Sequence, residues 1–80
     1  NSLHPGMIET PMMDNGFQAV VDAGGAESVQ QLKDGMIALT PLGRLGQPED
    51  LAAGVFFLAS ADSAFMTGAE LVMDGGWTAQ

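Results

Sequence analysis

The sequence has no cysteine, no tyrosine, one histidine and two cationic side chains among its 80 residues. The lack of cysteine excludes disulfides, and His4 alone cannot form a zinc site, so we expect no bound metal. A chain this short builds a small core and usually needs a disulfide, a metal or a partner for stability. Of these aids, only a partner remains.

Positive charge is the second shortage. Lys33 and Arg44 stand against ten acidic residues, which gives a formal net charge of −8 and an isoelectric point near 4.1. Proteins that bind nucleic acids or anionic membrane surfaces present a basic patch, and this composition provides none. No apolar run approaches the roughly 20 residues of a bilayer span. We therefore expect no nucleic acid partner and no membrane attachment.

The beginning of the chain has no targeting feature. Asn1 is not an initiator methionine, and no basic segment precedes an apolar one, so we recognise no secretory signal. We expect a cytoplasmic protein. The start without methionine indicates a piece of a longer polypeptide, and processing of the N-terminus is the alternative.

What the sequence does contain is apolar: 46% of its residues are hydrophobic, which is too many for a disordered segment. Glycine and proline divide the chain into short elements without an interdomain linker, which indicates one structural unit. The predicted elements are a strand over 1–4, a helix from Pro11 that Gly24 ends, a helix from Ser28 that Thr40 ends, a loop over 41–48, a helix over 49–60 and a strand over 70–74.

The helix starts have recognisable signals. Thr10 can cap the first helix while Pro11 takes the first helical position, where its missing N–H costs nothing. Ser28 and Gln31 have the spacing of a capping box at the start of the second helix.

The helix predicted over 49–60 has no charged side chain from Leu51 to Ala59. Periodicity places Leu51, Val55, Leu58 and Ala59 on one face, with Ala52, Phe56 and Phe57 further round. A helix that is apolar all round must be covered on more than one side. We expect it to pack on a sheet and on a second subunit; the alternative is a helix buried inside one large domain.

Most patterns of catalytic residues are absent. The acidic residues lie at helix starts, in loops and at strand ends, so we interpret them as solvated or capping groups. His4 has no Ser, Cys or Asp at the spacing of a catalytic triad. The loop PLGRLGQP lacks the strand–loop–helix setting and the following Lys-Ser or Lys-Thr of a phosphate loop. We therefore predict no catalytic residue in this chain.

The segment HPGMIETPM carries the chemical interest. Pro5 and Gly6 follow a predicted strand and let a ligand approach bare backbone. The amides and carbonyls of Met7 and Ile8 are free to pair with a planar amide, and Thr10 offers a hydroxyl at a helix N-terminus, which favours anions. These groups suit a nicotinamide carboxamide and a pyrophosphate. A plain strand–turn–helix corner is the alternative.

Three runs resemble parts of the short-chain dehydrogenase/reductase family: PGMIETPM at 5–12, PLGRLGQPEDLAAGVFFLAS at 41–60 and TGAELVMDGGW at 67–77. They occur in the family's order and span nearly the whole chain. The Thr-Pro-Met at 10–12 is similar to bacterial hydroxysteroid and secondary-alcohol dehydrogenases. The resemblance implies an α/β fold, namely the C-terminal part of a doubly wound, Rossmann-type parallel sheet with its last two strands and their connecting helices.

The resemblance also implies roles for individual residues. Pro5 and Gly6 would lie beside the nicotinamide of NAD or NADP, the Ile8 backbone would hold its carboxamide, and Thr10 would anchor the carboxamide or the pyrophosphate. Residues 11–38 would form a lid over the substrate. In this lid we expect a soft apolar lining for a hydrophobic carbonyl compound or alcohol, with ordinary helix core as the alternative. The lining residues would be Met12, Met13, Phe17 and Met36.

The implied activity is hydride transfer between the nicotinamide cofactor and a secondary alcohol or ketone. The family's Gly-rich loop and its Ser, Tyr and Lys catalytic set have no counterpart here, so the segment alone should be inactive. We expect a homo-oligomer, a homotetramer, assembled through the helix at 49–60 and the strand at 70–74. A non-catalytic, self-associating module derived from such an enzyme is the competing interpretation.

Overall fold

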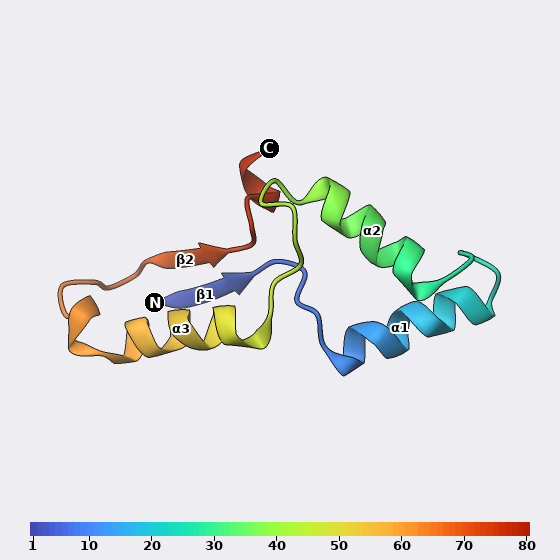
Figure 1. Ribbon diagram of the computed structural model, residues 1–80. Coiled ribbons are helices and arrows are strands. Elements are labelled where there is room, and N and C mark those ends of the chain that lie inside the picture. Colours follow the sequence, from blue (N-terminus) through green and yellow to red (C-terminus); the bar gives the residue numbers. More distant parts are fainter.

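The computed structural model describes residues 1–80 as two strands and three α-helices in the order β1, α1, α2, α3, β2 (Figure 1). The strands are β1 (Ser2–Pro5) and β2 (Glu70–Met73), and the helices are α1 (Pro11–Asp22), α2 (Val29–Leu39) and α3 (Pro48–Ala59). Short 3-10 turns follow α3 at Ala61–Ser63 and β2 at Trp77–Ala79. Every predicted element is present, with ends shifted by one or two residues. None of the helices has the length and hydropathy to cross a membrane.

The two strands pair in parallel, from Ser2 beside Glu70 to Pro5 beside Met73. Parallel neighbours need a crossover connection, and α3 supplies it by packing along both strands (Figure 1). Leu71 and Met73 are half-buried while Val72 is exposed, so β2 has one face toward the protein and one outward. The observed α/β architecture is therefore the predicted one.

A glycine brings α3 onto the sheet. A Cβ atom on Gly54 would collide with the Met73 sulfur and would lie 3.2 Å from Leu3 Cδ1, so the helix backbone itself touches these side chains. This contact explains a residue that costs about 1 kcal/mol relative to alanine in helix propensity. The face predicted for this helix is wrong at two positions: Leu51 and Leu58 are half-buried, but Val55 (55% exposed) and Ala59 face outward, and Gly54 lies toward the sheet.

Gly6 brings the ends of β1 and β2 into close contact. Its N–H donates to the Met73 carbonyl (3.2 Å), and a Cβ atom on Gly6 would lie 2.7 Å from Asp74 Cα and 2.9 Å from the Asp74 carbonyl oxygen. Since these neighbours are backbone atoms, they cannot move aside without separating β1 from β2.

Helices α1 and α2 form a hairpin that extends away from the strands (Figure 1). As predicted, the Thr10 hydroxyl accepts the Met13 N–H (3.2 Å) at the start of α1. The Ser28 hydroxyl likewise accepts the Gln31 N–H (3.0 Å), but the Gln31 side chain bonds the Glu27 N–H (2.8 Å) instead of that of Ser28. The predicted capping box is thus only half formed.

The loop between α2 and α3 crosses the carboxyl ends of both strands. Its Leu42 N–H donates to the Gly75 carbonyl (2.9 Å), and its Gly46 N–H donates to the Met7 carbonyl (2.9 Å). Arg44 donates two hydrogen bonds to the Asp50 carboxylate, at 2.8 and 3.1 Å. The Arg44 bond and a Gln47 N–H bond (2.7 Å) lower the pKa of Asp50 to about 2.

The chain is less compact than a self-sufficient domain. Its Cα radius of gyration is 15.2 Å, whereas a domain of this length has about 12 Å. Only four residues are buried: Thr40, Leu45, Gly54 and Ser63. Large apolar side chains such as Phe56 (74% exposed) and Met12 (83%) face outward. A core of this size cannot offset the conformational entropy that the chain loses on folding. We therefore expect these apolar faces to be covered by further protein surface.

We expect Gly6→Ala to destabilise the protein by about 1–3 kcal/mol, because overpacking against backbone forces the strand ends apart. Gly16→Ala is the matched control, since nothing lies within 4 Å of a Cβ atom at that position in α1. That change should stabilise by ~0.5–1 kcal/mol. Denaturant unfolding of the full-length protein measures both changes. Equal effects at the two glycines would contradict the close contact.

A second expectation concerns pH. Arg44→Gln should raise the pKa of Asp50 from about 2 toward its ordinary 3.8, with the Gln47 N–H still lowering it. Because the folded pKa is depressed, the ion pair stabilises the fold above pH 4 and this contribution is lost as the pH falls toward 2. Carboxyl-carbon NMR titration of the full-length protein and the variant measures both pKa values. The same midpoint in both proteins would refute the role of Arg44.

Candidate functional site

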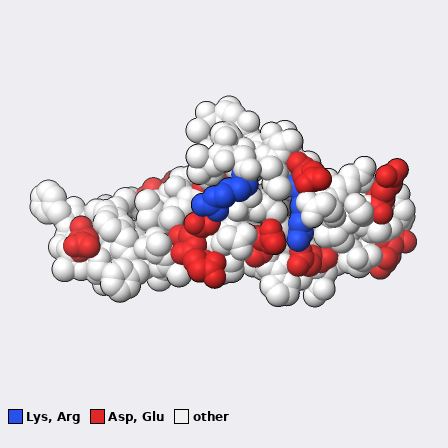
Figure 2. Space-filling model, viewed as in Figure 1, with Lys and Arg blue, Asp and Glu red and all other residues white.

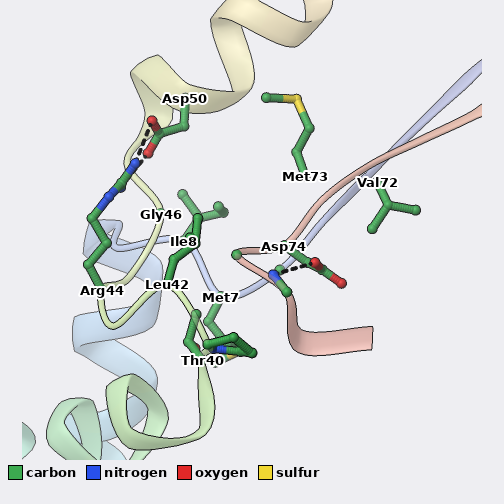
Figure 3. A pocket seen from close by; sticks show the side chains of 14 residues that line it. Met7, Ile8, Thr40, Leu42, Arg44, Gly46, Asp50, Val72, Met73 and Asp74 are labelled. Carbon is green, nitrogen blue, oxygen red and sulfur yellow. Dashed lines mark hydrogen bonds and ion pairs between the residues drawn. The ribbon is translucent and has the colours of Figure 1, made fainter. Parts of the chain in front are cut away.

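The carboxyl ends of β1 and β2 open into a pocket of about 520 Å³ (Figure 3). Three segments line it: the turn after β1, the loop between α2 and α3, and the end of β2. Its residues are Gly6, Met7, Ile8, Thr40, Pro41, Leu42, Arg44, Gly46, Asp50, Val72, Met73, Asp74, Gly75 and Gly76. Open α/β sheets bind ligands beyond the carboxyl ends of their strands, and small-molecule pockets measure roughly 300–1,000 Å³. Position and size both identify this pocket as the candidate site.

The backbone of Ile8 is the chief polar feature of the turn after β1. Gly46 forms a parallel bridge beside Ile8, in which its N–H donates to the Met7 carbonyl (2.9 Å) and its carbonyl accepts the Glu9 N–H (2.8 Å). The bridge therefore uses the groups on either side of Ile8, while the Ile8 N–H and carbonyl have no hydrogen-bond partner in the chain. The prediction that the Met7 carbonyl is also free was wrong, because Gly46 occupies it.

The Ile8 side chain packs against Gly46. A Cβ atom on Gly46 would collide with Ile8 Cδ1, so the two residues touch across the bridge. Figure 3 shows Ile8 and Gly46 side by side between Arg44 and Met7. The Ile8 N–H and the Ile8 carbonyl are thus one donor and one acceptor on the same stretch of backbone. A planar amide offers the complementary acceptor and donor.

Pro5 and Gly6 precede this backbone, at the end of β1. Both line a second, smaller pocket of about 250 Å³ with Met7 and Trp77. The bare side of Gly6 is filled by Asp74, so its lack of a side chain serves strand packing. Gly6 also lines the main pocket, so the approach of a ligand to its backbone stays a prediction.

Asp74 ends β2 and organises the turn that closes the pocket. Its carboxylate accepts the Gly76 N–H (2.9 Å), the Thr78 N–H (2.9 Å) and the Thr78 hydroxyl (2.7 Å), and Figure 3 draws it at the end of the strand. These bonds, the Thr78 hydroxyl first, lower the pKa of Asp74. The carboxylate therefore stays ionised and committed to the turn. Sequence reasoning missed this role; the only signal was an aspartate directly before two glycines.

The remaining predicted residues lie outside the pocket lining. The Thr10 hydroxyl accepts the Met13 N–H, and its own hydrogen has no acceptor in the chain. Met12 is 83% exposed, whereas Met13 and Phe17 are half-buried on one side of α1. His4 is exposed on β1 and pairs with the Ser2 hydroxyl (2.8 Å), away from the pocket. The structure thus brings Gly6 and Ile8 together and keeps the lid residues apart from them.

Residues 1–78 match the sequence profile of a family described as enoyl-(acyl carrier protein) reductase. An NADP-dependent (R)-specific alcohol dehydrogenase of Lentilactobacillus kefiri is 44% identical over the whole chain, which covers 27% of that enzyme. Cyclohexanol dehydrogenase of an Acinetobacter species is 41% identical over the whole chain, which covers 26% of it. The chain thus spans about a quarter of the length of the curated relatives it matches.

Solved structures with a similar fold belong to the same family as these relatives. A short chain dehydrogenase family protein from Francisella tularensis superposes with a TM-score of 0.89 and 36% identity, over 98% of this chain and 32% of that protein. The chain belongs to the short-chain dehydrogenase/reductase family and corresponds to the C-terminal segment of its fold.

Proposed function

We propose that this chain forms part of an oxidoreductase that transfers a hydride between NAD or NADP and a secondary alcohol or ketone. The observation that carries the proposal is the free N–H and carbonyl of Ile8, presented at the carboxyl end of β1 next to the start of α1. Two relatives named as alcohol dehydrogenases support the substrate class, and one of them is NADP-dependent.

The residues around Ile8 fit the polar groups of a nicotinamide cofactor. The carboxamide offers an oxygen to the Ile8 N–H and an amino group to the Ile8 carbonyl. The Thr10 hydroxyl has a hydrogen to donate, and it stands at the N-terminus of α1, where the helix dipole favours a pyrophosphate. When bound, the cofactor would give or accept the hydride at its nicotinamide ring. Pro5 and Gly6 would fix the edge of that ring.

The hairpin of α1 and α2 would form the substrate lid. Its exposed Met12 is the side chain free to meet a hydrophobic alcohol or ketone, and Met13 and Phe17 would support it from the half-buried side. The chain has no tyrosine and places no proton-transferring group in the pocket, since Asp50 and Asp74 are both held as carboxylates. We therefore propose that the catalytic groups come from other parts of the enzyme and that the segment alone is inactive.

Helix α3 supports a further part of the proposal, assembly into a homo-oligomer. One face of α3 lies on the sheet, and the opposite face exposes Phe56. A two-fold axis would cover this face with its own copy. A self-associating module without activity would use the same surface, so cofactor binding separates the two functions.

Thr10→Val tests the cofactor site. Loss of one neutral hydrogen bond should weaken binding of NAD or NADP by ~0.5–1.5 kcal/mol, roughly threefold to tenfold. Calorimetric titration of the full-length enzyme, well below its melting temperature, measures the dissociation constant. Ser28→Ala is the matched control, because Ser28 caps α2 as Thr10 caps α1 but is distant in sequence from Ile8, which Thr10 follows by two residues.

Both cap variants should lose about 1 kcal/mol of stability. Only Thr10→Val should lose affinity for the cofactor. If both variants bind the cofactor as the wild type does, Thr10 is a helix cap and nothing more.

Phe56→Asp tests the assembly. A charge on the exposed face of α3 should dissociate the oligomer of the full-length enzyme, because a buried unpaired carboxylate is strongly unfavourable. Asn15→Asp makes the same change of charge on the exposed face of α1 and should leave the assembly intact. Sedimentation velocity measures both. An unchanged oligomer in a normally folded Phe56→Asp variant would contradict the interface.

A further inference from the structure

The hairpin of α1 and α2 is joined to the rest of the molecule at two narrow places. The chain enters it through Glu9 and Thr10 and leaves it through Thr40, and each helix packs mainly on the other (Figure 1). At the exit, the Gln80 side chain donates to the Leu39 carbonyl (2.7 Å). The entry is held by a different kind of contact, an ion-pair cluster.

Lys33 forms this cluster from the middle of α2. Its Nζ lies 2.7 Å from Asp14 Oδ1, in the first turn of α1, and 3.7 Å from Glu9 Oε1, just before α1. Its side chain is only 15% exposed. Lysines that are so shielded from water are usually paired with an acidic group. The Asp14 carboxylate, which accepts from the Lys33 ammonium, is the main cause of the raised pKa of Lys33, so the ammonium stays charged at neutral pH. Figure 2 shows both cationic side chains of the protein flanked by acidic ones.

The two partners of Lys33 stand on either side of Thr10. Glu9 is fixed to the pocket loop, since its N–H donates to the Gly46 carbonyl (2.8 Å). Asp14 directly follows Met13, whose N–H holds the Thr10 hydroxyl (3.2 Å). A displacement of α2 therefore moves the Lys33 ammonium and, with it, its partners Glu9 and Asp14. These two residues stand before and after Thr10, the residue proposed to contact the cofactor.

We propose that Lys33 is a positioning residue, which couples the placement of the lid hairpin to the Thr10 hydroxyl proposed to contact the nicotinamide cofactor. This inference rests on the proposed function. Helix α2 contributes no residue to the pocket, so Lys33 acts only through Glu9 and Asp14. Such coupling is reciprocal: a cofactor that orders Thr10 favours the docked hairpin, and the docked hairpin favours the cofactor.

A double-mutant cycle in the full-length enzyme tests the coupling, with the dissociation constant of NAD or NADP as the readout. Lys33→Met should weaken cofactor binding about threefold, the size expected for a partly exposed ion pair. When added to Thr10→Val, it should weaken binding little further, because a residue that acts through Thr10 has nothing left to position. Lys33→Arg, which keeps the charge, should bind nearly as the wild type does.

Gln30→Met is the matched control on the same helix, since Gln30 is exposed and bonds only Asp34 within α2 (2.8 Å). It should leave the dissociation constant unchanged. If Lys33→Met does not fold, Asp14→Asn removes the nearer partner while keeping the ammonium, and it carries the same expectation.

The coupling is refuted if Lys33→Met melts at a lower temperature but binds the cofactor like the wild type, or if its effect adds fully to that of Thr10→Val. These results would leave Lys33 a structural residue and the cofactor site intact. A wild-type enzyme that binds neither NAD nor NADP would instead refute the proposed function itself.

Discussion

The parallel pairing of β1 with β2 is the constraint on which the rest of the structure depends. The two strands come from opposite ends of the chain, and each is short. Their pairing is made tight by two positions without a Cβ atom: Gly6 sits against the Asp74 backbone, and Gly54 sets α3 against Met73 and Leu3. These contacts align the carboxyl ends of the strands, and that alignment creates the pocket.

The loop between α2 and α3 lines the pocket together with the ends of the two strands. Between Thr40 and Gln47 it bonds the turn after β1 through Gly46 and the turn after β2 through Leu42. Because Gly46 takes the Met7 carbonyl and the Glu9 N–H, it leaves the polar groups of Ile8 facing the other way. The geometry of the candidate site is thus a consequence of a single isolated bridge. Arg44 and Asp50 anchor the loop to α3 beside it.

The sequence was informative where structure is decided locally. Thr10 and Ser28 cap their helices as their positions predict, because a cap needs only the three residues that follow it. The parallel strands and the family followed from motifs. The face that α3 buries could not be predicted, since the contact of Gly54 with Met73 depends on a strand far along the chain.

The site was predictable to the same extent. The importance of the turn after β1 was evident from its residues, but the loss of the Met7 carbonyl to Gly46 was not, because nothing local links the two segments. The three bonds of Asp74 and the double ion pairing of Lys33 were missed for a similar reason. Acidic residues read one at a time look solvated, and only the fold shows which of them has a partner.

The distance along the chain between β1 and β2 has a consequence for how this segment acquires its structure. Nearly all other elements lie between the two strands, so closing their ladder requires one of the largest loops that the chain can form. Non-local contacts of this kind form late, whereas α1 and α2 follow one another in the chain, so the contacts between them can form earlier. During synthesis on the ribosome, β1 emerges first and must wait, with one edge unpaired, for β2 to follow. The apolar residues of β1 and α3 are exposed throughout that interval, which is therefore the period when the nascent protein is most exposed to aggregation.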